Sequence, residues 1–588
     1  MIKIRNIYRK VHKKFPLLVS NTLINRTTKE IQANIKKIFQ DNFRNKLNNI
    51  VPDKSNIHKS IRLIKPSKSA NISLSDNTGI ILDPKLISNK IADYYEGIYD
   101  GEITVDESIV NNKVCEYVSA INNNPNNSNN LSTCLSEVME FVRTLKNKKS
   151  PGSDGVTNRA IKNLPYSGVH QLVLITNAII SFNYFPNCWK TSKIIPIPKP
   201  GKTGKPENTR PISLLSGLSK LVERIIHKRL WEVVEKWIPD EQFGFVYKKS
   251  TNFALMRVLN ILKNSKMRRK TTFGIFLDIK KAFDSVWHNG LIFKMINCNI
   301  PSQLILLTKS YLSDRKFYVS TNNTNSNVRN MVAGVPQGSV LGPLLYVFFM
   351  HDIPIPSSPQ TKLQIYADDT AIFITSYSAY QCSIRLQAYL NTLMDYYKNW
   401  NICINPTKTQ LVHFYPTSRY QNKLKSAVPI TINGHSIEIV RSAKYLGITL
   451  TNNLKFGPHI QDLKKKTAMA FNTLYPILNY NSGLDCKNKL LVYKLYIRPI
   501  FTYAIPSWYD LANKSEKDCL QKFQNKALRF VFNAWPRPPY YQNKSTNYLH
   551  DLAQILKIED FSAKMTSNSI CRLLSIDNDM LNEIAHQH

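Results

Sequence analysis

Acidic residues are scarce in this sequence. It holds 40 aspartates and glutamates against 79 lysines and arginines, which gives a formal net charge of +39 at pH 7. Hydrophobic residues make up 43% of the chain and aromatic residues 10%, so folded cores can form and wholesale disorder is excluded. A positive charge of this size predicts a polyanionic partner, with nucleic acid as the first candidate. A basic, soluble protein without such a partner is the alternative.

Paired cysteines are also missing. The nine cysteines stand singly, no two of them have a Cys-x-x-Cys spacing, and none clusters with histidine. This pattern argues against a structural zinc site. An odd, dispersed set also argues against the disulfide framework of a small secreted protein.

Long hydrophobic runs are the third absence. Residues 1–15 carry charge but no apolar core, so they do not form a signal peptide. The longest apolar run, Val340–Met350, includes glycine and proline and is shorter than the ~18 residues that a membrane span needs. We therefore expect an intracellular, soluble protein of the nucleus, the cytoplasm or both, which is neither secreted nor bound to a membrane.

The chain divides into three segments by composition. Its 588 residues give room for roughly 3–4 domains. Residues 1–130 are basic and partly helical in pattern, and they end in the Asn-rich stretch INNNPNNSNN, which is typical of a linker. Residues 131–455 carry mixed strand and helix patterns, and residues 456–588 are helical again. Within the middle segment, the polar residues 263–270 predict a solvated turn between two strands.

Two segments place aspartates next to apolar strands. Residues 272–278 begin with an apolar run that is typical of a buried strand, with Asp278 near its end. In residues 363–375, apolar alternation on both sides of Ala-Asp-Asp-Thr predicts a β-hairpin whose turn presents Asp368 and Asp369. Each segment alone also has a plain structural interpretation, because Asp278 could cap a following helix and the Asp pair could be ordinary turn residues.

Brought together, these three carboxylates would repel one another. At ~4 Å each pair would cost about 4 kcal/mol with an effective dielectric constant near 20, so the cluster would need a divalent cation to neutralise it. Oxygen ligands without a nearby histidine or cysteine favour Mg²⁺, with Mn²⁺ as a substitute. Carboxylates that hold two such ions about 3.5–4 Å apart are suited to in-line displacement at phosphorus.

A glycine-containing loop lies between the two aspartate segments, in residues 333–343. Its glycines let the backbone approach a ligand closely, and an apolar helix follows. Gln337 beside Gly338 is expected to face a bound base or sugar. For Gly342 and Pro343 the expectation is a plain turn before a core helix.

The ordered motifs resemble those of a known family. They are LDIKKAFD, GVPQGSVLGPLLY, YADD, INPTKTQ and KYLGITL, preceded by KKSPGSDGV, WKTSKIIPIPKPGK, NTRPISLLSGLSKLVERII and EQFGF. Together they resemble the reverse transcriptases of non-LTR retrotransposons, most closely those of the jockey group. The resemblance covers residues 131–588 well. It extends more loosely to residues 57–68 and 86–99, which are similar to the basic connector that precedes the polymerase in such elements.

The resemblance implies an α/β (α+β) fold, the right-hand polymerase with fingers, palm and helical thumb, preceded by a basic helical connector. Residues 1–130 would be the connector, residues 131–455 the fingers and palm, and residues 456–588 the thumb and C-terminal region. The implied activity is that of an RNA-directed DNA polymerase, which extends a DNA 3′-OH with dNTPs on an RNA template and releases pyrophosphate. The implied cofactor is a pair of Mg²⁺ ions.

The resemblance also assigns roles to individual residues. Asp278 and Asp368 match the metal-binding aspartates, Asp369 matches the carboxylate beside them, and the Ile279 carbonyl would complete one metal shell. Phe283 matches the bulky residue that rejects a ribose 2′-OH. The other matches are Gln337 and Gly338 (the loop over template and nucleotide), Arg210 and Lys193 (the triphosphate), Lys408 (a proton donor to pyrophosphate, or a solvated surface lysine), and Tyr445, Leu446 and Gly447 (the primer grip).

The sequence departs from the family pattern in three places. Val246 stands where the family often has arginine after Gly-Phe, so a cation contact to the template is missing or moves to Lys248 or Lys249. No endonuclease sequence precedes the polymerase motifs, and no Cys/His knuckle follows the thumb region. We therefore expect a truncated element copy, a gene fragment or an excised polymerase, with an endonuclease domain encoded upstream as a partner.

Three other functions remain open. An intron-encoded reverse transcriptase and maturase is disfavoured by Gly342-Pro343 and by the absence of a recognisable maturase tail. A catalytically silent nucleic-acid-binding remnant is disfavoured by the intact aspartates. An RNA-dependent RNA polymerase shares the carboxylate chemistry, but Phe283 argues against it.

Overall fold

The computed structural model contains residues 1–588. It describes residues 6, 21–48, 72–76, 79–100, 107–123, 131–201, 204–416, 427–479, 482, 484–534 and 545–587. The chain forms two compact units. The larger unit comprises residues 69–455, 506–508 and 567–588, and the smaller unit comprises residues 1–68, 456–505 and 509–566. None of the described helices has an apolar stretch long enough to cross a membrane.

The larger unit is built on a five-stranded sheet with the order β14-β11-β5-β10-β9. Its strands are β5 (Thr271–Asp278), β9 (Thr361–Tyr366), β10 (Asp369–Ser376), β11 (Gln410–Phe414) and β14 (Ile439–Val440). β5 is the central strand, antiparallel to both β10 and β11, and its first seven residues are buried. The buried strand predicted to end in Asp278 is confirmed.

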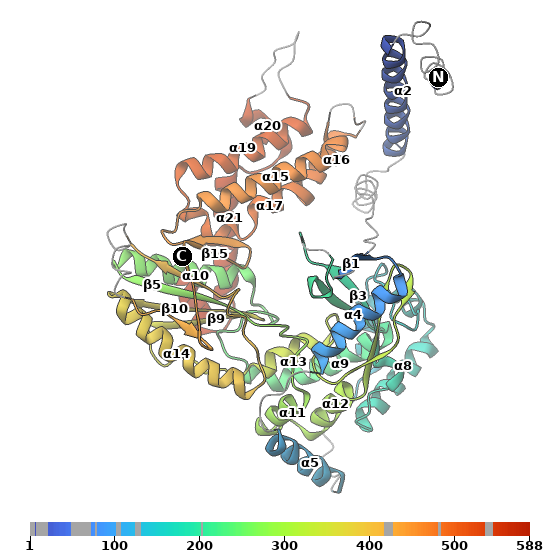
Figure 1. The fold of residues 1–588 in the computed structure, drawn as a ribbon, viewed down its shortest axis with the longest axis vertical. Coiled ribbons are helices and arrows are strands. Elements are labelled where there is room, and N and C mark those ends of the chain that lie inside the picture. The colour runs from blue at the N-terminus through green and yellow to red at the C-terminus, as the bar shows by residue number, and fades with distance from the viewer. Residues whose placement is uncertain are drawn as a thin grey trace. The chain divides into compact units, whose positions relative to one another are not determined.

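Helices cover both faces of this sheet. α14 (Ala379–Asn399) packs its buried leucines with Phe273 and Ile275 of β5 in the main hydrophobic core. α10 (Thr251–Met267) lies on the opposite face, where the Thr272 hydroxyl donates to Ser265 at 2.6 Å (Figure 1). Because α10 extends to Met267, the turn predicted for residues 263–270 is wrong for its first half. The apolar spacing within α10 continues the helix into a segment that looks polar by itself.

A second sheet of the larger unit has the order β4-β3-β6-β7, with β8 also paired to β6. Its strands are β3 (Thr191–Pro198), β4 (Thr209–Leu214), β6 (Arg315–Thr321), β7 (Thr324–Asn325) and β8 (Arg329–Met331). α4 (Pro84–Tyr99) lies against this sheet and forms a separate apolar core with Phe317 and Val319. Residues 84–99, predicted to belong to a basic connector, thus pack on the larger unit.

The remaining elements of the larger unit are mostly helices. They are α5 (Ser108–Asn123), α6 (Leu135–Thr144), α7 (Asn158–Lys162), α8 (Tyr166–Ser181), α9 (Gly217–Val234), α11 (His288–Asn297), α12 (Ser302–Leu312), α13 (Leu341–Phe349) and α22 (Asp579–His586), with the hairpins β1 (Leu74–Asp76)–β2 (Gly79–Ile81), β12 (Thr431–Ile432)–β13 (His435–Ser436) and β15 (Ser442–Tyr445)–β16 (Ile448–Thr451). α22 packs against α10, so the last helix of the chain belongs to the larger unit.

The smaller unit is helical. Its main elements are α2 (Asn21–Asn48), α15 (Gly457–Leu478), α16 (Cys486–Val492), a π-helix (Tyr493–Ile497), α17 (Arg498–Thr502), a 3₁₀-helix (Tyr509–Leu511), α19 (Lys514–Val531), α20 (Thr546–Ala553) and the first half of α21 (Ile558–Leu574). α19 begins with a capping box, in which Asn513 and Glu516 each accept a hydrogen bond from the other's backbone N–H. The mixed α/β character predicted from the sequence is confirmed, and the helical pattern after residue 456 is present in the structure.

Candidate active site

The three predicted carboxylates meet at one end of the central sheet. Asp278 and Asp369 are direct cross-strand partners of β5 and β10, so their side chains lie on the same face. Asp368 lies in the turn between β9 and β10, directly after Ala367, whose φ is +57°. The β5–β10 pairing therefore brings together residues that are 91 positions apart in the chain.

The environment of Asp368 and Asp369 favours the protonated forms of their carboxyl groups. The surrounding protein removes water from Asp369 and raises its pKa to about 6, and the negative charges of Asp368 and Asp278 add to the rise. Desolvation is also the largest cause that raises the pKa of Asp368, with a contribution from Asp278, while Arg210 acts in the opposite direction. Carboxylates whose pKa is raised by neighbouring negative charges are stabilised in the ionised form by a nearby cation.

Lys408 supplies one cation to this cluster. Its Nζ lies 3.5 Å from Oδ2 of Asp278, with both side chains partly exposed. The Asp278 carbonyl accepts a hydrogen bond from the Asn405 N–H, and Ile279 forms an isolated bridge with Ile404. The INPTKTQ motif is thus fixed next to the strand that carries Asp278.

The donor set fits a hard divalent cation. Asp278, Asp368 and Asp369 offer only oxygen ligands, which Mg²⁺ and Mn²⁺ prefer. Among the described residues, no group of three or more His, Cys, Asp or Glu side chains is placed so that it could hold a metal ion by itself.

Phe283 lies in a small aromatic group beside this cluster. Its ring centroid is 4.6 Å from that of Tyr346 and 5.9 Å from that of Phe245, which meets it edge-on. Burial, followed by the charge of Asp368, raises the pKa of Tyr346, so this group lies close to the carboxylates. The neighbouring rings restrict the rotamers of Phe283, which remains half-buried.

The Gln337 side chain has a protein partner. Its Nε2 donates to both carboxylate oxygens of Asp284, at 2.9 and 2.8 Å, and its backbone carbonyl accepts from the Ser213 N–H at 2.8 Å. Gly338 has φ of +123°, and a Cβ there would lie 2.6 Å from the Ser213 carbonyl oxygen. Ser213 and Asp284 therefore fix this loop. Asp284 is the last residue of the LDIKKAFD motif but is not among the residues that the sequence predicts for the site.

The two predicted phosphate-binding cations lie on the second sheet. The register pairs Lys193 with Leu214 and Arg210 with Ile197, which places both cations on the same face. Arg210 is exposed, and its positive charge lowers the pKa of Asp368, against the larger effect of desolvation.

The predicted primer-grip residues lie at the turn of the β15–β16 hairpin, where Tyr445 is the last residue of β15 and Leu446 and Gly447 form the turn. The Tyr445 ring packs against Phe276 of β5 at 5.3 Å, and burial followed by the charge of Asp369 raises the pKa of its hydroxyl. Leu446 and Gly447 follow with φ of +43° and +87°. This hairpin is therefore fixed beside Asp369.

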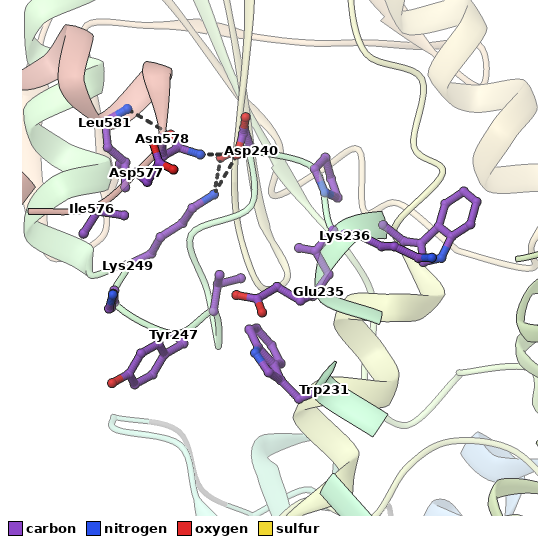
Figure 2. Close-up of a pocket in the computed structure, with 15 residues that line it drawn as sticks. Trp231, Glu235, Lys236, Asp240, Tyr247, Lys249, Ile576, Asp577, Asn578 and Leu581 are labelled. Atoms are coloured by element: carbon purple, nitrogen blue, oxygen red, sulfur yellow. Dashed lines mark hydrogen bonds and ion pairs between the residues drawn. The ribbon is translucent and has the colours of Figure 1, made fainter. Parts of the chain in front are cut away.

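Of the two lysines after Val246, only Lys248 is exposed to solvent. Lys249 is engaged within the protein, since its Nζ donates to the Asp240 carbonyl at 2.7 Å and lies 3.6 Å from the carboxylate of the same residue. Both lysines line a pocket of about 610 Å³ between residues 231–249 and residues 576–581 (Figure 2). Lys248 is therefore the better candidate for the template contact.

These observations describe a domain in which carboxylates from two neighbouring strands lie near an aromatic group and a lysine at one end of a central sheet. Such an arrangement is suited to the two-metal chemistry on phosphate that polymerases perform. Residues 197–450 match the family model described as reverse transcriptase (RNA-dependent DNA polymerase). The chain therefore carries a reverse transcriptase domain.

The curated relatives are named as proteins of a transposon and a mobile element. The chain is 37% identical over 448 residues to the probable RNA-directed DNA polymerase from transposon BS of Drosophila melanogaster. The aligned residues make up 75% of this chain and 48% of the relative. The chain is 35% identical to the RNA-directed DNA polymerase from mobile element jockey of the same species, over 73% of this chain and 46% of the relative. The chain thus spans about half the length of these relatives. The resemblance to jockey-like reverse transcriptases of non-LTR retrotransposons is confirmed.

A solved structure of apo telomerase from Candida tropicalis aligns with 68% of this chain and 69% of its own, at 11% identity and a TM-score of 0.32.

Proposed function

We propose that this chain is an RNA-directed DNA polymerase that extends a DNA 3′-OH with dNTPs on an RNA template and releases pyrophosphate. The pairing of Asp278 with Asp369, next to Asp368 at the end of the central sheet, carries this proposal. The relatives named RNA-directed DNA polymerases support it. The RNA template, the DNA primer and the dNTPs would be the partners, and the net charge of +39 suits such polyanions.

The right-hand polymerase architecture is part of this proposal. The five-stranded sheet with its carboxylates would be the palm, and the second sheet with α6, α7 and α8 would belong to the fingers. The helical smaller unit, rich in Lys and Arg among aromatic residues, would be the thumb that tracks the nucleic-acid backbone. Residues 1–130 would be the connector.

Each site residue has a defined task in this reaction. Asp278, Asp368 and Asp369, with the Ile279 carbonyl, would hold two Mg²⁺ ions, which when bound supply activation of the primer hydroxyl and charge neutralisation at the leaving phosphate. Arg210 and Lys193 would hold the triphosphate with charge-assisted hydrogen bonds. Lys408 would carry the proton that the pyrophosphate takes up, and Phe283 would exclude a ribose 2′-OH.

The remaining residues would position the nucleic acid. The loop at Gln337 and Gly338 would cover the template and the incoming nucleotide, and the turn of Tyr445, Leu446 and Gly447 would hold the primer end. We also place the protein inside the cell, in the nucleus or the cytoplasm. An endonuclease domain encoded upstream would supply target cleavage, and the greater length of the relatives leaves room for further domains.

Primer extension tests this proposal. The purified full chain should incorporate dNTPs on an RNA template with Mg²⁺, and Asp368→Asn should abolish incorporation because a metal ligand is lost. Asp395→Asn, on the exposed surface of α14, is the matched control and should keep activity. An inactive wild type, or an Asp368→Asn variant as active as the control, would refute the assignment. Competition between dNTPs and NTPs distinguishes the RNA polymerase alternative.

A further inference from the structure

A short segment outside the predicted site pairs with the hairpin that carries Asp368 and Asp369. Residues 241–243, from the EQFGF motif, run parallel to the end of β9 through a bridge between Gln242 and Ile365. The Ile365 N–H donates to the Glu241 carbonyl at 2.9 Å, and the Phe243 N–H donates to the Ile365 carbonyl at 2.8 Å. This segment therefore extends the sheet beside β9, at the end where the turn begins.

The Gln242 side chain reaches the turn itself. It is 1% exposed, and its Oε1 accepts hydrogen bonds from the Ala367 N–H at 2.9 Å and from the Gly244 N–H at 2.8 Å. Ala367 directly precedes Asp368 and has a left-handed φ of +57°, a conformation that costs an L-residue roughly 1–2 kcal/mol. One amide oxygen thus fixes a strained turn by its backbone N–H.

The neighbouring residues leave this segment little freedom. A Cβ on Gly244 would lie 2.3 Å from the Ala367 nitrogen, so the two backbones are already in close contact. On its other side Phe243 is buried with Leu573 and Leu581 of the C-terminal region, in a cluster that Tyr366 also contacts. Gln242 is therefore held between the turn and a packed core, which keeps its amide oxygen in place.

We propose that Gln242 is a positioning residue for the polymerase reaction. Through the Ala367 N–H it sets the direction in which the turn presents Asp368 and Asp369. The inference rests on the proposed function, because it assigns Gln242 a role in that reaction. The amide oxygen is the essential feature, since a side chain of similar size without an oxygen acceptor, such as methionine with its weakly accepting sulfur, would leave the buried Ala367 N–H without a strong partner.

Gln242→Met tests this role, with Gln364→Met as the matched control. Gln364 is another buried glutamine of the same sheet, and its Oε1 accepts from Arg257 at 2.8 Å rather than from the turn. Gln242→Met should lower kcat for dNTP incorporation about tenfold to a hundredfold, because small displacements of reacting groups cost that much. The KM for dNTP should stay within about twofold, since the phosphate-binding cations lie on the other sheet.

Hydrogen exchange of the peptide that contains residues 366–369 supplies the second measurement. Exchange there should accelerate in Gln242→Met and stay unchanged in Gln364→Met. The proposal is overturned if Gln242→Met keeps the wild-type kcat and the wild-type exchange rate. It is also overturned if the two variants lose equal amounts of melting temperature and Gln364→Met loses as much kcat as Gln242→Met. An inactive wild type would overturn the proposed function instead, and the exchange comparison would still decide whether Gln242 holds the turn.

Discussion

Replacement of Asp284 by asparagine should change how stability depends on pH. The Asp284 side chain is 5% exposed, and burial raises its pKa to about 7, against the opposing effects of the hydrogen bonds from Gln337 and the charges of Lys281 and Lys199. Tyr94, Tyr95 and Tyr99 also face this carboxyl group: burial is the main cause that raises the pKa of each, and Asp284 contributes. Asparagine keeps one oxygen acceptor for Gln337 and has no proton to lose.

The magnitude follows from the two pKa values. The ordinary pKa of the carboxyl group is 3.8, and at about 1.4 kcal/mol per pH unit the rise to about 7 corresponds to about 4 kcal/mol. Because the folded state binds the proton more tightly than the unfolded state, the stabilisation is fully present below pH 3.8 and is lost as the pH rises through 7. The free energy of unfolding of Asp284→Asn minus that of the wild type should therefore increase by about 4 kcal/mol between pH 4 and pH 8.

Urea unfolding of both proteins at several pH values measures this difference. Groups that titrate equally in the two proteins cancel, and the exposed Asp395→Asn variant controls for the loss of a surface carboxylate. Parallel stability profiles for the wild type and Asp284→Asn would refute the reasoning, since they would mean that Asp284 ionises as easily in the folded state as in the unfolded chain.

Three further substitutions test the surroundings of the site. Gly244→Ala should destabilise the fold by about 1–3 kcal/mol, seen as a lower melting temperature, and should reduce dNTP incorporation. The reason is that the added Cβ would lie 2.3 Å from the Ala367 nitrogen, and a wild-type melting temperature and activity would contradict this close approach. Phe283→Val should raise incorporation of NTPs relative to dNTPs by about 10–100-fold in a competition assay, and unchanged selectivity would remove Phe283 as the sugar filter. Glu223→Ala should destabilise the fold by about 2–4 kcal/mol in thermal unfolding. The fully buried Glu223 carboxylate accepts a hydrogen bond from the Val340 N–H at 2.7 Å, at the start of α13, and an unchanged melting temperature would contradict this capping role.

Local patterns were sufficient where neighbouring residues decide the structure. The apolar run before Asp278 is strand β5, and the alternation around Ala-Asp-Asp-Thr is the β9–β10 hairpin. The pattern of apolar and polar residues along a strand indicates which of its faces are buried. These two elements can therefore be predicted from a few consecutive positions. The predicted boundary between the turn and the second strand of this hairpin was less exact. Both aspartates were predicted in the turn, but Asp369 is the first residue of β10 and pairs with Asp278, so the turn consists of Ala367 and Asp368.

The sequence alone determined the reverse transcriptase motifs, the strand and hairpin that carry the three aspartates, and the chemistry that these residues suit. Only the tertiary structure decided that Gln242 holds the Ala367 N–H and that Asp284 receives the Gln337 amide. The tertiary structure was also needed to show that α22, the last helix of the chain, packs against α10. These partners are 53 to more than 300 positions apart, and no periodicity encodes such pairings. They arise when distant segments are packed around one core and each buried polar group must find whichever partner that packing brings near.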